Sequence, residues 1–444
     1  MTMHSKQAPN SPQGSGTDSG FAKYAPCSST FCSSKTLSYC SPAHGGWGIV
    51  RVGMLVPESY QLFVCPFACG RHGAIGAIDH GIKDRLSYLY IDEADIVSGR
   101  YEDLVIEATD ELLQVLGYRP RALMIFVSCL DDLLATDHEA FLSVLRAKYP
   151  DMRFTVGHMN PIQMGGKVPP HVSVQSKIYG MLDADVSAQD PTSVNIIGNH
   201  VPLAPESELI QILAQHGYTA RQIGTCTTFE DFQMMATSRL NIVVRPTALQ
   251  AAQQMKQRLG IDYLYAPITH DATELDGYYQ QLSDLLFKGS ELPVQSWRDD
   301  LADCALQVLK AVGDKPISVD YSATNRPFTL AKTLHNMGFA VKEVMANECI
   351  PLEAAARTWL EEHTKISWYS PTHHTAVDRP HCPEVISIGF ESGYYNGSQH
   401  MVPLVDCETL YGYHGMRRIL EMIDLAAADP KDAKQAITDY GLVV

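Results

Sequence analysis

The sequence predicts an α/β protein with three successive Rossmann-like domains, each a parallel sheet flanked by helices, behind a flexible N-terminal arm. Short apolar runs alternate with amphipathic runs at helical spacing along most of the 444 residues. The run A-L-M-I-F-V at 122–127 is continuously apolar, which is typical of a strand covered on both faces of a parallel sheet. The alternation also restarts twice in the same way, as strand, loop, helix and glycine, which favours separate units over one continuous sheet.

The individual elements divide the chain into four parts. Residues 1–38 are rich in Ser, Gly, Pro and Gln and are expected to form the arm. The first domain, 39–166, contains strands near 61–65 and 122–129 and helices near 101–116 and 138–149, with Gly117 as a helix stop. A Gly-Pro linker precedes the second domain, 167–292, whose first strand is expected at 193–198. The third domain, 293–444, follows a helix near 297–310, and its first strand begins at 316.

Composition excludes several functional classes. The chain is 45% hydrophobic and 19% charged, as in globular proteins, and its net charge of −16 gives no basic face for nucleic acid. No apolar run is long enough to cross a membrane, and the N-terminus has no apolar core of a secretory signal, so we expect a cytoplasmic protein. The 11 cysteines then favour metal ligation or free thiols over a disulfide framework.

Three of these cysteines lie where strands are expected to end. Cys40, Cys69 and Cys129 each sit at or just beyond an apolar run and are followed by Gly-rich or helix-like sequence. Residues at the carboxyl ends of parallel strands meet in one crevice, so thiols distant in sequence can converge there. Convergent thiolates are the ligands that iron–sulfur clusters prefer.

The surrounding motifs resemble the nitrogenase component 1 family, which includes the molybdenum-iron protein and nitrogenase-like oxidoreductases. The motifs that carry the resemblance are C-P-F-A-C-G at Cys69, V-S-C-L-D-D-L-L at Cys129, Y-I-D-E-A-D-I-V-S-G-R-Y-E-D-L between them, and L-Y-G-Y-H-G-M-R-R-I-L near the end of the chain. The resemblance spans roughly residues 39–425. The last motif looks like a helix N-terminus, where backbone donors can face an anion or a cluster.

The resemblance implies a subunit of a nitrogenase-like reductase. Cys40, Cys69 and Cys129 would hold a [4Fe–4S] or larger, P-cluster-like cluster at the interface with a homologous subunit, in a homo- or hetero-oligomer. A separate ATP-hydrolysing iron protein would deliver the electrons. G-x-G-x-x-G and G-x-x-x-x-G-K-[ST] are both absent at the expected places, so we expect no bound NAD or ATP in this chain.

Two other classes of function remain open. The same family includes scaffolds on which a metal cluster or cofactor is assembled and handed on. A structural protein that depends on thiols or zinc, without redox function, is the third interpretation.

Further residues are candidates for the metal or the cavity. Cys65 and Cys407 are additional candidate ligands, and Cys65 is alternatively a buried thiol at a strand end. In nitrogenase proper a cysteine and a histidine anchor the large cofactor. The resemblance puts Arg245 at that cysteine, where a guanidinium cannot ligate iron, and Cys407 near the histidine. His270 and His72 join Arg245 as cavity candidates, and His44 is a further one; each is alternatively a structural polar group.

Two more groups of metal-ligating residues fit no known spacing. Cys27 and Cys32 are either extra ligands or thiols on an arm that packs on a partner. The other group is read as a loop or as an irregular zinc site, and it consists of His373, His374, His381 and Cys382.

Overall fold

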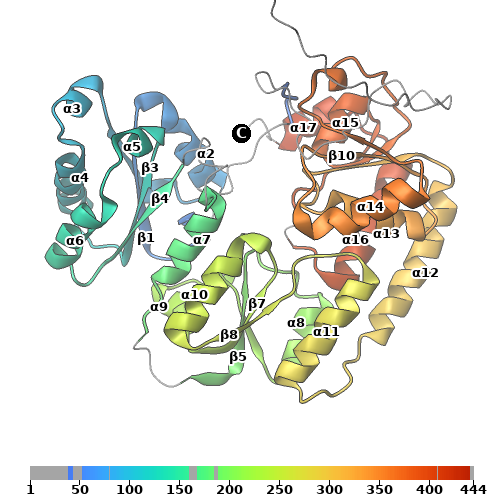
Figure 1. The fold of residues 1–444 in the computed structure, drawn as a ribbon, viewed down its shortest axis with the longest axis horizontal. Helices are drawn as coiled ribbons and strands as arrows, with labels where there is room; N and C mark the ends of the chain where they lie inside the picture. Colours follow the sequence, from blue (N-terminus) through green and yellow to red (C-terminus); the bar gives the residue numbers. More distant parts are fainter. Residues whose placement is uncertain are drawn as a thin grey trace, which may run out of the picture.

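The computed structural model describes residues 39–43, 53–79, 81–159, 168–184, 189–407 and 409–440. Their strands form three separate sheets, all of whose pairings are parallel, with helices packed around each sheet (Figure 1). The predicted arm, residues 1–38, lies outside the described residues.

The first sheet has the order β2-β1-β3-β4. Its strands are β1 (Ser59–Cys65), β2 (Leu86–Tyr90), β3 (Ala122–Val127) and β4 (Arg153–His158). Its helices are α2 (Arg71–Asp79), α3 (Glu93–Val97), α4 (Tyr101–Leu116), α5 (Cys129–Leu134) and α6 (His138–Lys148). Gly117 ends α4 at φ 68°, a left-handed conformation that glycine adopts without strain, as the sequence predicted.

The second sheet has the order β6-β5-β7-β8. Its strands are β5 (Asp190–Ile197), β6 (Thr219–Arg221), β7 (Ser238–Val243) and β8 (Asp262–Tyr265). The accompanying helices are α8 (Glu208–Gln215), α9 (Phe229–Gln233), α10 (Leu249–Leu259) and α11 (Ala272–Leu286).

The third sheet has the order β11-β10-β9-β12-β13. Its strands are β9 (Ile317–Asp320), β10 (Val341–Met345), β11 (Ser367–Tyr369), β12 (Ile386–Ile388) and β13 (His400–Val402). Its helices are α12 (Gln295–Val312), α13 (Pro327–Asn336), α14 (Ala354–His363), α15 (Phe390–Asn396), α16 (Gly412–Ala428) and α17 (Ala433–Tyr440).

The central strands β1 and β3 of the first sheet are buried on both faces, which explains their mostly apolar sequences. Along β1, Leu62 and Val64 pack into a core beneath α4 and α6, whereas Phe63 and Cys65 pack into a second core on the opposite face. That second core continues through α7 (Pro170–Gly180) to the second sheet, because α7 packs against both β4 and α10.

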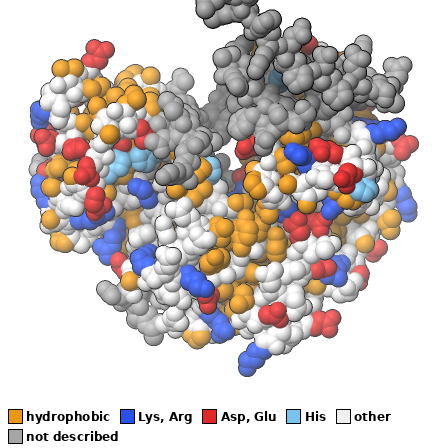
Figure 2. All heavy atoms as spheres, in the orientation of Figure 1, with side chains coloured by type: hydrophobic (Ala, Val, Ile, Leu, Met, Phe, Trp, Pro, Cys, Tyr) orange, Lys and Arg blue, Asp and Glu red, His pale blue; other side chains and the backbone are white. Residues whose placement is uncertain are grey.

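A third core joins the second and third sheets. At the surface, hydrophobic side chains gather over the middle of the face shown in Figure 2. The predicted α/β class with parallel sheets is therefore confirmed, while the exact domain limits stay a prediction. Within the described part of the chain, none of the helices combines the length and apolarity needed to cross a bilayer.

Candidate functional site

Each sheet has a point at which the strand order reverses. These points lie between β1 and β3, between β5 and β7, and between β9 and β12. In open parallel sheets, the loops on either side of such a point diverge and leave a crevice at the carboxyl ends of the strands, where ligands bind. Several of the predicted site residues follow these strands.

Cys69 and Cys129 flank the reversal point of the first sheet. Cys69 ends the short helix η2 (Phe67–Cys69), which turns away from β1 after Pro66, and Cys129 is the first residue of α5 after β3. Both cysteines are partly exposed. Beside Cys69, a Cβ on Gly70 would lie 2.7 Å from the Tyr88 ring, so only glycine fits between η2 and β2.

Cys65 has a different environment from Cys69. It is the last residue of β1, fully buried among the apolar side chains of the second core. Burial, with a smaller contribution from Cys69, raises the pKa of the Cys65 thiol to about 12. A thiol held in its protonated form is a poor metal ligand, and this environment favours the alternative of a buried core cysteine.

Cys40 lies against the third sheet. The amide of Tyr39 donates to the carbonyl of Thr372 (2.9 Å), and Ser41 Oγ donates to Glu391 Oε2 (2.5 Å). Glu391 is in the first turn of α15, directly after β12, and its other oxygen accepts from Tyr321 Oη at the end of β9 (3.2 Å). The exposed Cys40 is thus fixed at the reversal point of the third sheet, not of the first.

The structure does not test whether the three sulfurs hold a cluster together, because a cluster spaces its ligands more widely than a single ion does. Among the described residues, one group of three or more His, Cys, Asp or Glu side chains has all its ligand atoms within 4.8 Å of one another, and it contains no cysteine. The joint role of Cys40, Cys69 and Cys129 therefore stays a prediction.

Arg245 follows β7 at the reversal point of the second sheet, and its guanidinium is engaged within the chain. Its Nε donates to Asn199 Oδ1 (2.8 Å), which follows β5. Its two terminal nitrogens bind Asp406, one at the carbonyl oxygen and one at the carboxylate (both 2.6 Å). The buried side chain thus joins the second sheet to the loop that follows β13 of the third.

Two more candidates meet beside this ion pair. Cys407 Sγ lies 3.6 Å from His270 Nε2, and both side chains are buried. Burial lowers the pKa of His270 to about 3 and raises that of Cys407 to about 12, so both are uncharged at neutral pH. Cys407 and the preceding Asp406 have φ of 45° and 53°, a left-handed conformation uncommon for residues other than glycine. The structure therefore brings Arg245, His270 and Cys407 together as a buried, internally bonded group.

The helix N-terminus near residue 412 faces an anion that the chain itself supplies. The amides of Tyr413 and His414, in the first turn of α16, donate to the two oxygens of Glu208 (2.6 and 3.1 Å). Burial raises the pKa of Glu208 in spite of these hydrogen bonds. A Cβ on Gly412, at φ 67°, would overlap the Glu208 carboxylate. These donors are thus occupied by a side chain of α8.

The remaining candidates give less information. The side chain of His72 is not described, and His44, Cys27 and Cys32 lie outside the described residues. His373 bonds to Thr375 Oγ1 (2.8 Å) and Cys382 Sγ to Glu384 Oε1 (3.3 Å). The loop that carries them does not contribute to the one convergent group of potential ligands in the described chain.

The convergent group consists of Asp131, His138 and His158. It was not predicted from the sequence, because the metal ligands were predicted from the cysteines. Asp131 lies in the first turn of α5, His138 opens α6, and His158 ends β4. His138 Nε2 lies 2.6 Å from Asp131 Oδ2, and the two imidazole rings are 5.0 Å apart. An acid just after one strand and a histidine at the end of the next were the signal that could have revealed it.

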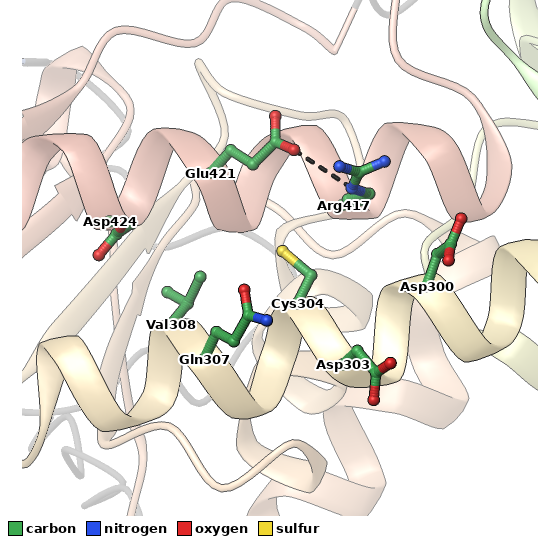
Figure 3. A pocket seen from close by; sticks show the side chains of 8 residues that line it. All are labelled: Asp300, Asp303, Cys304, Gln307, Val308, Arg417, Glu421 and Asp424. Carbon is green, nitrogen blue, oxygen red and sulfur yellow. Dashed lines mark ion pairs between the residues drawn. The ribbon is translucent and has the colours of Figure 1, made fainter.

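A cavity of about 430 Å³ lies on another part of the molecule, between α12 and α16 (Figure 3). Four of its eight side chains are acidic, and Arg417 forms an ion pair with Glu421 (3.2 Å). The lining residues are Asp300, Asp303, Cys304, Gln307, Val308, Arg417, Glu421 and Asp424. None of the predicted site residues is among them.

Comparisons with known proteins agree with the resemblance found in the sequence. A family model described as nitrogenase component 1 type oxidoreductase matches residues 46–428. A solved structure titled "Nitrogenase Cp1 at pH 6.5" superposes with a TM-score of 0.66 at 16% identity, over 88% of this chain and 92% of the other. A second, "Nitrogenase Cp1 at pH 5", gives 0.62 at 13% identity over 90% of each chain. No curated protein matches the chain in sequence.

Proposed function

Because this chain belongs to the nitrogenase component 1 type oxidoreductases, we propose that it is a subunit of a nitrogenase-like reductase holding an iron–sulfur cluster. Cys69 and Cys129 are the primary ligands, with Cys40 as the third. The observation that carries the proposal is the position of Cys69 and Cys129 on either side of the reversal point of the first sheet.

The donor chemistry of this place suits iron and sulfide. Thiols bind iron as thiolates, and Cys69 and Cys129 are partly exposed, whereas Cys65 is buried. Gly70 keeps the backbone after Cys69 close to β2. The structure gives Cys65 no comparable access, and we assign it to the core.

Cys40 is held on the third sheet. We therefore propose that it becomes a ligand of the cluster only when the cluster and a homologous subunit are bound. The cluster supplies one-electron transfer. This chain's residues position the ligands, and the electrons come from a separate ATP-hydrolysing iron protein. Arg245 is already paired with Asn199 and Asp406, which supports a structural role there instead of an anchor for a large metal cofactor.

Metal analysis of cysteine variants tests the cluster assignment. The chain is purified without oxygen, reconstituted with iron and sulfide, and examined for bound iron, acid-labile sulfide and paramagnetic resonance. Cys69→Ala and Cys129→Ala are expected to lose most of the iron and the signal. Cys304→Ala is the matched control, because this thiol is also partly buried but lies on α12. Full iron content in the Cys69 and Cys129 variants would overturn the assignment.

A second experiment separates the reductase from an assembly scaffold. The reconstituted protein, with its homologous subunit, is mixed with an iron protein, MgATP and candidate substrates. ATP-dependent reduction of a substrate supports the reductase. Transfer of an intact cluster to an apo-enzyme without any turnover would favour the scaffold instead.

A further inference from the structure

We propose that Asp131, His138 and His158 form a second metal site, which binds one divalent transition-metal ion next to the cysteines of the first sheet. The three side chains come from α5, which follows β3, from the first residue of α6, and from the last residue of β4. One ligand atom from each lies within 4.8 Å of the other two. This inference does not depend on the proposed function, because it uses no cysteine.

The spacing suits a small cation. Zinc binds imidazole nitrogen and carboxylate oxygen at about 2.0–2.2 Å, so ligands around one ion lie roughly 3–3.5 Å apart. Asp131 Oδ2 and His138 Nε2 are 2.6 Å apart and would separate by less than an ångström to admit the ion. Two imidazoles and one carboxylate are a ligand set of zinc and of non-haem iron(II).

Unsatisfied buried atoms indicate that the group needs something more than its internal bonds. Asp131 is 1% exposed, and its Oδ1 makes no hydrogen bond of ordinary geometry in the described chain, although the buried Tyr101 hydroxyl lies beside this carboxylate. Burial, with a smaller contribution from Asp131, raises the pKa of Tyr101. The buried Nδ1 of His158 likewise makes no hydrogen bond, although Asp132 Oδ1 lies 3.3 Å away. A buried polar atom without a partner costs about 1–3 kcal/mol, and a cation bound by that atom, as when a carboxylate binds through both oxygens, would remove the cost.

The local backbone holds the ligands in place. Ser128 caps α5 just before Cys129, with its hydroxyl accepting from the amide of Leu130 (3.4 Å). Asp137 caps α6, with its carboxylate accepting from the amides of the first turn. These caps fix the starts of two helices and hence the directions of Asp131 and His138. A metal here would tie the carboxyl ends of β3 and β4 together.

Zinc titration of the full chain, stripped of metal by a chelator, tests the site. With a chromophoric competitor, we expect one tight Zn²⁺ equivalent per chain. His138→Ala and His158→Ala should each weaken Zn²⁺ binding by at least about 100-fold, since loss of a residue that only hydrogen-bonds to a metal ligand already lowers metal affinity ten- to a hundred-fold. His335→Ala is the matched control, because this histidine is also half-buried but lies on α13, and it should bind like the wild type.

Cobalt substitution tests the site in the wild-type protein, so the test remains possible if a variant fails to fold. X-ray absorption of the wild-type Co²⁺ complex should show only nitrogen and oxygen ligands. Sulfur in the first shell would assign the ion to the cysteines and overturn the proposal, as would the absence of a tight Zn²⁺ equivalent. Unchanged Zn²⁺ affinity in folded His138 and His158 variants would overturn it too.

Discussion

Ser41 Oγ donates a 2.5 Å hydrogen bond to Glu391 Oε2, joining two residues that are 350 positions apart in the chain. This contact fixes the segment that carries Cys40 to the start of α15. Ala43, two residues further on, packs with apolar side chains of α15, β13 and α17 and adds to the attachment.

The first prediction concerns this attachment. Ser41→Ala removes a hydrogen bond to a carboxylate, which is worth about 1.5–3 kcal/mol, so the segment should open roughly ten- to a hundred-fold more often. Hydrogen exchange of the Tyr39 amide, which donates to Thr372, measures this opening. Ser98→Ala, at an exposed hydroxyl, should leave the exchange of Tyr39 unchanged. Equal protection of Tyr39 in the Ser41 variant and the wild type would refute the anchoring role.

The second prediction separates Cys65 from Cys69. Cys65→Ser buries a hydroxyl without an identified partner, and we expect it to destabilise the fold by about 1–3 kcal/mol while leaving bound iron unchanged. Cys69→Ser should do the reverse, with lost iron and little change in stability, since Cys69 is partly exposed. Denaturant unfolding and iron analysis of both proteins measure the contrast. Loss of iron from a fully stable Cys65→Ser protein would make Cys65 a ligand.

The third prediction follows from a buried carboxyl. Burial raises the pKa of Glu353 to about 7, although the amides of Thr329 and Phe328 donate to it and Arg326 is near. The folded state then binds the proton more tightly than the unfolded state, whose pKa is near 4.5. The resulting stability is complete below about pH 4.5 and is lost as the pH rises through 7, in total roughly 3 kcal/mol.

Glu353→Gln tests this dependence because it cannot ionise. Relative to the wild type, the variant should gain stability between pH 5 and pH 8 in denaturant unfolding. Exposed carboxyl groups elsewhere contribute equally to both proteins and cancel in the difference. A difference that is constant across this range would show that Glu353 titrates normally.

The fourth prediction concerns the ion pair between the second and third sheets. Arg245→Met should cost about 2 kcal/mol, below the 3–5 kcal/mol of a fully buried pair because the Asp406 side chain is 36% exposed. Thermal unfolding measures the loss. Arg119→Met, which removes an exposed pair with Asp151, should cost less than about 1 kcal/mol. Equal effects of the two substitutions would mean that Arg245 does not join the sheets.

The fold was predictable because its signals are local. A strand covered on both faces is mostly apolar, and β3 shows this in six consecutive residues, whereas β1 keeps Ser59 and Gln61 among its seven. Helix periodicity and the stop at Gly117 are equally local. The carboxyl ends of strands, where Cys69, Cys129 and Arg245 lie, follow directly from these runs.

The assembly of the site was less predictable because it depends on contacts between distant segments. Nothing near Cys40 in the sequence indicates that it is attached to α15, and nothing near His270 indicates a contact with Cys407, 137 residues away. The donors at the start of α16 were foreseen, but the carboxylate that fills them belongs to Glu208, about 200 residues earlier.

Helix α7 determines where the chain can be cut. It begins at Pro170, after the Gly-Pro linker, yet it packs on β4 of the first sheet and on α10 of the second. A recombinant fragment that stops at residue 166 would expose the apolar side of the first sheet to water. A fragment that stops after Gly180 would instead expose the apolar face of α7. Both fragments should aggregate on expression.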